Sequence, residues 1–251
     1  MKDINIIESL IIEKGRIVSH RDLVKALSGY QDVNNKILNL AKKGFLVNLR
    51  RGVYYIARLG SLGYTSISNY LIANAIGEKS FVSFEAALKY HGIYDQGLKK
   101  IQSISQKQYL NKTIESITYE YIKVKSSNYF GLEKYKVDGG MARIATKERT
   151  ILDIIEYKKT VSNISLVQEK LENYLDEFDF EKIIFYAKSY SQTTIKILGL
   201  ILDFMNRNKD ADKLNSLINK KSTSRLAKNS DKFSNRWRLY YNSILEEHAH
   251  N

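Results

Sequence analysis

The chain of 251 residues contains no cysteine and no proline. The absence of cysteine excludes disulfides and thiolate metal sites, and it is typical of a protein that works in a reducing cytosol. Proline makes up about 5% of an average protein, so its absence leaves helix ends and turns to glycine, asparagine, aspartate and serine. Isoleucine, asparagine, lysine and tyrosine are abundant, which we interpret as the codon bias of an A/T-rich genome.

Long apolar runs are also missing. No segment approaches the roughly 20 apolar residues that span a bilayer, and Asp3, Glu8 and Glu13 interrupt the apolar stretch at the N-terminus. That stretch has neither the apolar core nor the cleavage site of a signal peptide. We therefore expect a cytoplasmic protein without a membrane partner.

What the chain does have is apolar residues in ordinary number and an excess of basic ones. Hydrophobic residues make up 43% of it, which is typical of a globular protein, and the formal net charge is +13. A strongly basic balance favours polyanionic partners. Acidic residues outnumber basic ones only in residues 151–206, a segment that a protein coating a polyanion along its whole length would not need.

The first 58 residues show three apolar stripes with helical spacing, followed by a basic hairpin. Ser19, with Asp22 three residues later, is typical of a helix start, and Asp32 is a second cap candidate. Three short helices followed by a hairpin are the element order of a winged helix-turn-helix. We predict that residues 1–58 form such a DNA-binding domain.

The third helix and the hairpin supply the candidate DNA contacts. Asparagine can pair with adenine in the major groove, lysine contacts guanine or phosphate, and arginine at a hairpin tip can reach the minor groove or a phosphate. Two alternatives are a solvated helix face, common in an A/T-biased protein, and an edge strand protected by charge. The predicted DNA-binding residues are Asn34, Asn35, Asn39, Lys42, Lys43, Asn48, Arg50 and Arg51.

Residues 59–251 form the second predicted domain, so that the whole chain is of the α+β class. Residues 58–66 are expected to be a linker. Segments that alternate apolar and polar residues predict a small, mainly antiparallel sheet at about 99–145, with a tight turn at Asp138 and Gly139. Residues 146–251 are predicted to be helical.

No motif for catalysis or cofactor binding is present. The chain lacks a phosphate-binding loop, a dinucleotide fingerprint, a nucleophile elbow and a zinc-binding His-Glu motif. The acidic stretch at 174–182 lacks the spacing and the central glycine of a calcium loop. We predict no enzymatic activity, no cofactor and no metal site.

Two polar groups in the second domain are candidates for an interface. Glu148, Arg149 and Asp153 lie on one predicted helix, where Arg149 and Asp153 form either a surface ion pair or a polar anchor at an interface. The only tryptophan, Trp237, lies between Arg236 and Arg238. Trp237 is expected to hold a C-terminal helix in the core and to leave both arginines facing solvent or a polyanion.

Four segments in this order resemble the AbiEi antitoxins of type IV toxin–antitoxin and phage abortive-infection systems. They are "RRGVYYI", "SFEAALKYHGIYDQ", "VDGGMARIATKERTILDII" and "NRWRLYYN". The resemblance covers most of the chain. It implies an N-terminal domain that binds inverted repeats in its own promoter and represses the operon. It also implies a C-terminal domain that neutralises a cognate AbiEii toxin, a nucleotidyltransferase, without the need for a stable complex.

Two alternatives to this prediction stay open. The first is a winged-helix regulator whose large domain senses a small molecule in an apolar pocket with convergent polar groups. The second is an enzyme that acts on nucleic acid or on the toxin, which would require a cluster of carboxylates or a nucleophile created by the fold.

Overall fold

The computed structural model describes residues 2–56 and 67–247. They belong to two compact units, each of which gathers three separate stretches of chain. Unit 1 consists of residues 1–82, 98–124 and 133–144, and unit 2 consists of residues 83–97, 125–132 and 145–251. Both units mix helices and strands, so the α+β class is confirmed. The predicted domain boundary at residues 58 and 59, and the predicted linker, lie outside the described residues.

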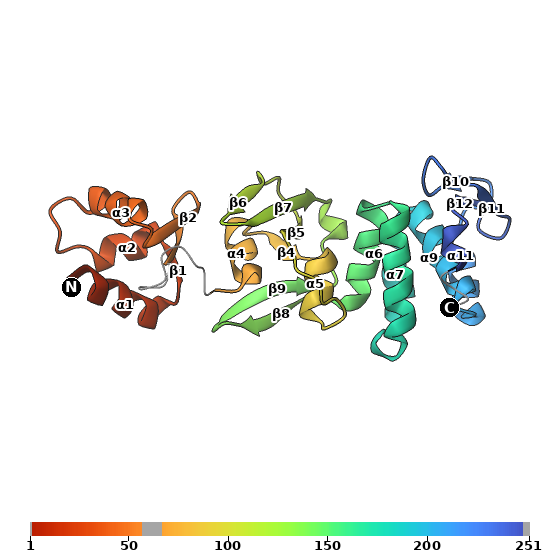
Figure 1. Cartoon of the computed structure of the whole chain (residues 1–251), viewed down its shortest axis with the longest axis horizontal. Helices are drawn as coiled ribbons and strands as arrows, with labels where there is room; N and C mark the ends of the chain where they lie inside the picture. The colour runs from red at the N-terminus through yellow and green to blue at the C-terminus, as the bar shows by residue number, and fades with distance from the viewer. Residues whose placement is uncertain (1, 57–66, 248–251) are drawn as a thin grey trace. The chain divides into compact units, whose positions relative to one another are not determined.

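The N-terminal part of unit 1 contains the predicted helices and hairpin, drawn in red and orange in Figure 1. Apolar side chains of all three helices, among them Ile7, Leu23 and Ile37, enclose one core. The short first strand was not predicted; it pairs antiparallel with the second strand of the hairpin, Ile17 opposite Tyr55. The elements are α1 (Lys2–Lys14), β1 (Ile17–Ser19), α2 (His20–Ala26), α3 (Val33–Lys42), β2 (Leu46–Arg50) and β3 (Val53–Ile56).

Both predicted helix caps are formed. The Ser19 hydroxyl accepts a hydrogen bond from the Asp22 backbone N–H at 3.1 Å, while the Asp22 carboxylate accepts one from the Ser19 backbone N–H at 2.9 Å. Asp32 accepts a hydrogen bond from the Asn35 backbone N–H at 3.0 Å. These caps satisfy backbone donors that have no partner inside the helix, and so they fix where α2 and α3 begin.

The rest of unit 1 is a helix and a six-stranded sheet in the order β6-β7-β5-β4-β9-β8. The predicted sheet is present and is mixed: β4 pairs antiparallel with β5 and β6 with β7, whereas β5 pairs parallel with β7 and β4 with β9. Positive φ angles at Asp138 and Gly139 form the predicted tight turn. The elements are α4 (Asn69–Ile76), β4 (Ser80–Val82), β5 (Lys100–Ser105), β6 (Lys112–Ile114), β7 (Ile117–Lys123), β8 (Leu132–Val137) and β9 (Gly140–Ala145).

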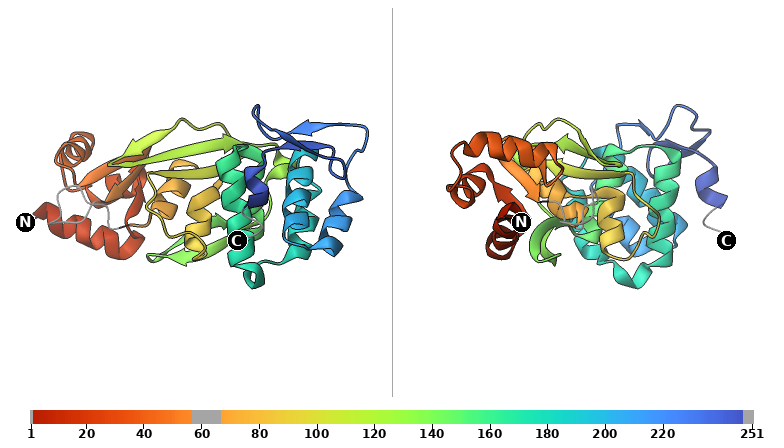
Figure 2. Two further views of the ribbon diagram at one scale, coloured as in Figure 1. Left: turned by 45° about the vertical axis from the view of Figure 1, so that its right-hand side comes forward. Right: turned by 60° about the vertical axis from the view of Figure 1, so that its left-hand side comes forward.

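Unit 2 is built around α6, which packs against α5, α7, α8 and α9. The helical turns η1 (Ser126–Asn128) and η2 (Leu175–Glu177) lie in its connections. Figure 2 shows α6 and α7 in green and the later helices in blue. The helices are α5 (Phe84–Tyr90), α6 (Lys147–Tyr157), α7 (Val161–Asn173), α8 (Phe180–Ala187), α9 (Gln192–Phe204), α10 (Asn208–Asn215) and α11 (Ile244–Glu247).

The prediction that residues 146–251 are wholly helical is wrong near the end of the chain. A three-stranded sheet in the order β10-β12-β11 is formed by β10 (Ser224–Arg225), β11 (Lys232–Ser234) and β12 (Leu239–Tyr241). Leu239 and Tyr241 are buried and Tyr240 between them is exposed, which is the period of a strand. Strands of two or three residues are too short for this period to stand out in a sequence.

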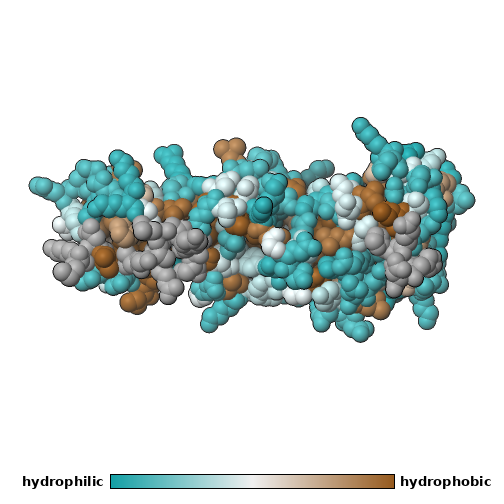
Figure 3. All heavy atoms as spheres, in the orientation of Figure 1, coloured by the Kyte–Doolittle hydropathy of each residue, from teal (hydrophilic) through white to brown (hydrophobic). Residues whose placement is uncertain are grey.

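One face of the molecule can be described by its hydropathy. Hydrophilic residues cover most of the face of the molecule shown in Figure 3. Within the described ranges, no helix combines the length and the apolar character needed to cross a bilayer.

Candidate nucleic-acid interface

Helix α3 presents a polar face to solvent. Ile37 and Leu40 are buried in the core of the N-terminal part of unit 1, so the helix can turn only one side outward. The capping aspartate, Asp32, fixes the first turn of this helix. The predicted contact residues Asn34, Asn35, Asn39, Lys42 and Lys43 are all exposed.

The hairpin that follows separates its two arginines. Arg51 lies in the turn beside Gly52, whose φ of 73° an L side chain rarely adopts, and its side chain is exposed. No hydrogen bond or ion pair to another described residue engages that side chain. No described residue therefore holds the Arg51 side chain away from a phosphate or a groove.

Arg50 points back into its own unit. Its Nε donates a hydrogen bond to the carbonyl oxygen of Ala75 at 2.9 Å, and its Nη2 lies 3.4 Å from Oε2 of Glu78. The side chain is 38% exposed. Arg50 is thus held by a carbonyl and a carboxylate of unit 1, unlike Arg51, and its contact with DNA stays a prediction.

Asn48 is also engaged by unit 1. Its side-chain amide donates to the carbonyl oxygen of Arg50 at 3.1 Å. The ammonium group of Lys112 donates to the backbone carbonyl oxygens of Asn48 at 2.7 Å and of Leu49 at 2.9 Å. Burial lowers the pKa of Lys112. Asn48 is exposed, but its amide and its backbone carbonyl already have partners. These contacts help to fix the position of the hairpin.

The predicted ion pair of α6 lies in the interior of unit 2. Arg149 and Asp153 are both 0% exposed, and the Arg149 Nε donates to the Asp153 carboxylate at 2.9 Å. The same carboxylate accepts hydrogen bonds from the hydroxyls of Ser83 and Tyr190, each at 2.7 Å. The expectation of a surface or interface pair is therefore wrong, since all of these groups contact their own chain.

The protonation states of this cluster follow from its donors. Burial raises the pKa of Asp153, and Arg149, Ser83 and Tyr190 act in the opposite direction. Three donors on one carboxyl group favour its ionised form, which we assign. Burial and the neighbouring Asp153 raise the pKa of Tyr190 well above its ordinary value. The phenol therefore stays protonated and donates.

Three further contacts hold Arg149 and its neighbour Glu148. The Arg149 guanidinium donates from Nη2 to the carbonyl oxygen of Asn128 at 3.0 Å and lies 4.3 Å from the ring centroid of Phe130. Glu148, another candidate interface residue, is 4% exposed, and its Oε2 lies 3.3 Å from the ammonium of Lys182. The side chains of Arg149 and Glu148 both make their contacts inside unit 2.

Trp237 is buried as predicted, but in the connection between β11 and β12 and not in a helix. Its indole N–H donates to the Asp203 carboxylate at 2.6 Å. Arg236 bridges Asp203 at 3.0 Å and Asp212 at 2.7 Å. Arg238 is half-buried, with its guanidinium 5.4 Å from the ring centroid of Phe233.

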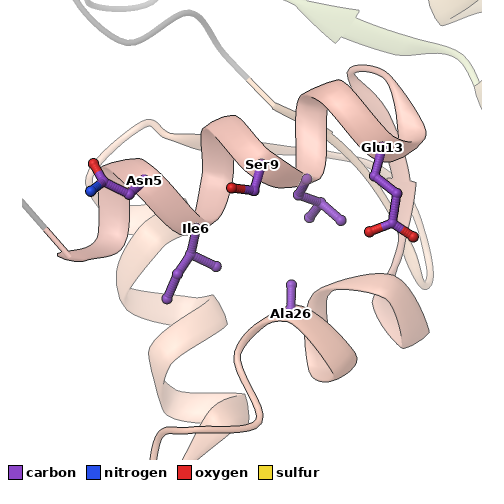
Figure 4. A pocket seen from close by; sticks show the side chains of 6 residues that line it. Asn5, Ile6, Ser9, Glu13 and Ala26 are labelled. Carbon is purple, nitrogen blue, oxygen red and sulfur yellow. The ribbon is translucent and has the colours of Figure 1, made fainter.

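One pocket lies in the N-terminal part of unit 1. A groove of about 400 Å³ between α1 and α2 is lined by Asn5, Ile6, Ser9, Leu10, Glu13 and Ala26 (Figure 4). Among the described residues that line this groove, Glu13 is the carboxylate, and Asp22 lines the adjoining pocket that shares Glu13. Across the described residues, no group of three or more histidines, aspartates and glutamates is placed to hold a metal ion.

The chain was compared with known proteins in sequence and in structure. In sequence, the chain matches no protein-family model and no curated protein. In structure, it is similar to the RV2827C protein from Mycobacterium tuberculosis, which is known from a crystal structure, with a TM-score of 0.69 and 13% sequence identity. The match covers 93% of this chain and 89% of that one. At this identity the likeness establishes a shared fold along nearly the whole chain.

Proposed function

We propose that the protein is a DNA-binding transcriptional autorepressor and an antitoxin that counteracts a nucleotidyltransferase toxin. Its N-terminal part is a winged helix-turn-helix, with α3 as recognition helix and the β2–β3 hairpin as wing. The observation that carries the proposal is the exposed polar face of α3, which packs against β2, together with the exposed Arg51 in the turn that follows β2. The partner is double-stranded DNA with inverted repeats in the protein's own promoter.

The chemistry of α3 suits the major groove. An asparagine amide can donate to and accept from adenine, and the lysines that end the helix can contact phosphate. Asn35, Asn39 and Lys42 all belong to its exposed side. In the proposed complex these side chains read bases while Arg51 holds the adjacent backbone or minor groove.

The antitoxin part of the proposal is based on the resemblance to the AbiEi family. Two of the segments that carry this resemblance build α5 and α6, which pack against each other. Ser83 comes from the first segment and Asp153 from the second, and they share a buried hydrogen bond of 2.7 Å. The shared segments thus have a structural reason to occur together, which supports a common architecture for this region.

A single full-length variant can separate the two activities. Asn35→Ala, Lys42→Gln and Arg51→Ala together remove exposed contacts without touching the core. We expect this triple variant to lose binding to promoter DNA and repression of a reporter. It should still rescue cells from the toxin when it is expressed from an independent promoter.

The control is Ser28→Ala combined with Lys25→Gln, an exposed pair of changes at the end of α2. The control should bind DNA as the wild-type protein does. Unchanged promoter binding by the triple variant would contradict the DNA-binding proposal. A wild-type protein that does not protect cells from an AbiEii-type nucleotidyltransferase encoded beside it would contradict the antitoxin proposal.

A further inference from the structure

The outer face of the β10–β12–β11 sheet carries a row of two aromatic rings with an arginine at each end. Arg225 on β10 pairs in register with Tyr240 on β12, which pairs with Phe233 on β11. The Arg225 guanidinium lies 4.1 Å from the Tyr240 ring centroid, and the centroids of Tyr240 and Phe233 are 4.7 Å apart. The Arg238 guanidinium lies 5.4 Å from the Phe233 centroid. We call Arg225, Tyr240, Phe233 and Arg238 the arginine–aromatic row.

This row belongs to the surface. Leu239 and Tyr241, which flank Tyr240, are 0% and 7% exposed and face the interior, whereas Tyr240 is 37% exposed. Successive strand residues point to opposite faces of a sheet, so the row lies on the outward face. The core of unit 2 does not need these rings, because Leu239, Tyr241 and Trp237 already fill the inner side.

The segment that carries the row is rich in basic residues. Within residues 219–242 the only acidic residue is Asp231, and its carboxylate accepts hydrogen bonds from the backbone N–H and the hydroxyl of Ser243. Lys232 pairs with Glu246, and Arg236 pairs with two aspartates. The cations of this segment that form no ion pair with a described residue are Lys220, Lys221, Arg225, Lys228 and Arg238. A surface with this imbalance is complementary to a polyanion.

The backbone at one end of the row is strained. Arg238 has a φ of 52°, in the left-handed region that residues other than glycine rarely adopt. Strained residues of this kind cluster at binding sites, where the surrounding structure holds them in place. The Nε of Arg238 is buried without a hydrogen-bond partner among the described residues. The strained backbone and the Nε without a partner among the described residues both belong to Arg238, a member of the row.

We propose that this face of unit 2 binds single-stranded nucleic acid. Aromatic side chains on a sheet and flat guanidinium groups stack on unpaired bases, and lysines and arginines beside them hold the phosphates. A duplex keeps its base faces stacked inside and offers nothing to Tyr240 and Phe233. The site is separate from α3 and does not depend on the DNA-binding proposal.

The test uses the full chain and three fluorescent probes of about 20 nucleotides, a length that matches the range of single-strand sites. The probes are oligo(U) RNA, oligo(dT) DNA and a mixed-sequence DNA duplex. The test variant is Tyr240→Ala with Arg225→Gln. Loss of one stacked base lowers affinity by about fivefold to a hundredfold, so we expect at least a tenfold loss for a single strand. Preference for RNA or DNA identifies the natural strand.

A matched control removes the same kind of pair elsewhere in unit 2. Phe185 is 66% exposed, and the Lys188 ammonium lies 5.8 Å from its ring centroid. Phe185→Ala with Lys188→Gln should change single-strand affinity by less than about twofold, and Tyr240→Phe should retain it. The triple variant in α3 and the hairpin should retain it too. These variants distinguish the row from general charge and from the α3 surface.

A second variant avoids the rings altogether and keeps the test informative if Tyr240→Ala does not fold. Lys221→Gln with Lys228→Gln should reduce the slope of log affinity against log salt by about 1.4 for a single strand. The proposal is overturned if the wild-type chain does not bind either single strand, or if the row and control variants behave alike. It is also overturned if the row variant weakens duplex binding as much as single-strand binding, or if the lysine variant leaves the slope unchanged.

Discussion

The Nε atom of Arg50 donates a hydrogen bond to the carbonyl oxygen of Ala75 at 2.9 Å. Ala75 lies in the last turn of α4, where carbonyl groups have no partner within the helix and where a cation is favoured by the helix dipole. Arg50 therefore caps α4 from the hairpin. Its neighbour Arg51 lies in the hairpin turn with an exposed side chain, so the two adjacent arginines have different surroundings.

The first prediction separates these two arginines. Arg51→Ala should weaken duplex binding and lower the salt slope by about one, because one phosphate contact is lost. Arg50→Ala should leave the slope unchanged and lower the free energy of unfolding by about 1 kcal/mol, because the Ala75 carbonyl loses its donor. Fluorescence anisotropy at several salt concentrations and urea unfolding measure the two effects. Equal losses of slope for both variants would assign Arg50 to DNA as well.

The second prediction concerns the buried carboxylate of Asp153. Asp153→Asn leaves the Arg149 charge buried without its counter-ion, which costs about 3–5 kcal/mol of unfolding free energy. Tyr190→Phe removes one of three donors and should cost about 1 kcal/mol. Trp237 lies in the same unit, and its fluorescence follows both unfolding curves in urea. A loss below 1 kcal/mol for Asp153→Asn is the behaviour of an exposed pair and would refute the buried assignment.

Local patterns explain what the sequence could predict. The Ser19–Asp22 cap, the buried stripe of α3 and the turn at Asp138 depend on residues within a few positions of each other. The exposed candidates on α3 follow from the same helical period. Each of these features is decided by backbone geometry that neighbouring residues set, so spacing alone predicts it.

The features that the sequence could not predict depend on contacts between segments that are distant along the chain. Arg50 and Ala75 are 25 residues apart, and Lys112 and Asn48 are 64 apart, so no spacing rule joins them. The i,i+4 spacing of Arg149 and Asp153 is the same in an exposed and in a buried pair. The helices α5, α8 and α9 pack around α6 and bury this pair. Burial of the pair therefore depends on tertiary packing.

The third prediction is a pH dependence at the start of α2. Hydrogen bonds from Ser19 lower the pKa of Asp22 below its ordinary value of 3.8. The ionised carboxylate therefore stabilises the fold above pH 3.8, and this contribution is lost as the pH falls through the lower pKa of the folded state. Ser19→Ala should cost about 1 kcal/mol at neutral pH and flatten the stability profile below about pH 4.

Circular dichroism of urea unfolding at a series of pH values measures this profile. Ser28→Ala is the matched control, because Ser28 is exposed and lies just beyond the end of α2. It should change the unfolding free energy by less than about 0.5 kcal/mol at every pH. If Ser19→Ala kept the acid limb of the wild-type profile, the hydrogen bonds to Asp22 would not be the source of its lowered pKa.

The fourth prediction uses the contact between Gly199 and Trp237. A Cβ atom at Gly199 would overlap the six-membered ring of Trp237, which is 0% exposed and tied to Asp203. Gly199→Ala should therefore lower the free energy of unfolding by about 1–3 kcal/mol and shift the tryptophan emission, because ring and helix cannot both keep their places. Gly97→Ala, in the same unit, has nothing within 4 Å of the added Cβ and should be neutral. Similar stability and emission for the two variants would mean that α9 and the β11–β12 connection can move apart without cost, which a close-packed interior does not allow.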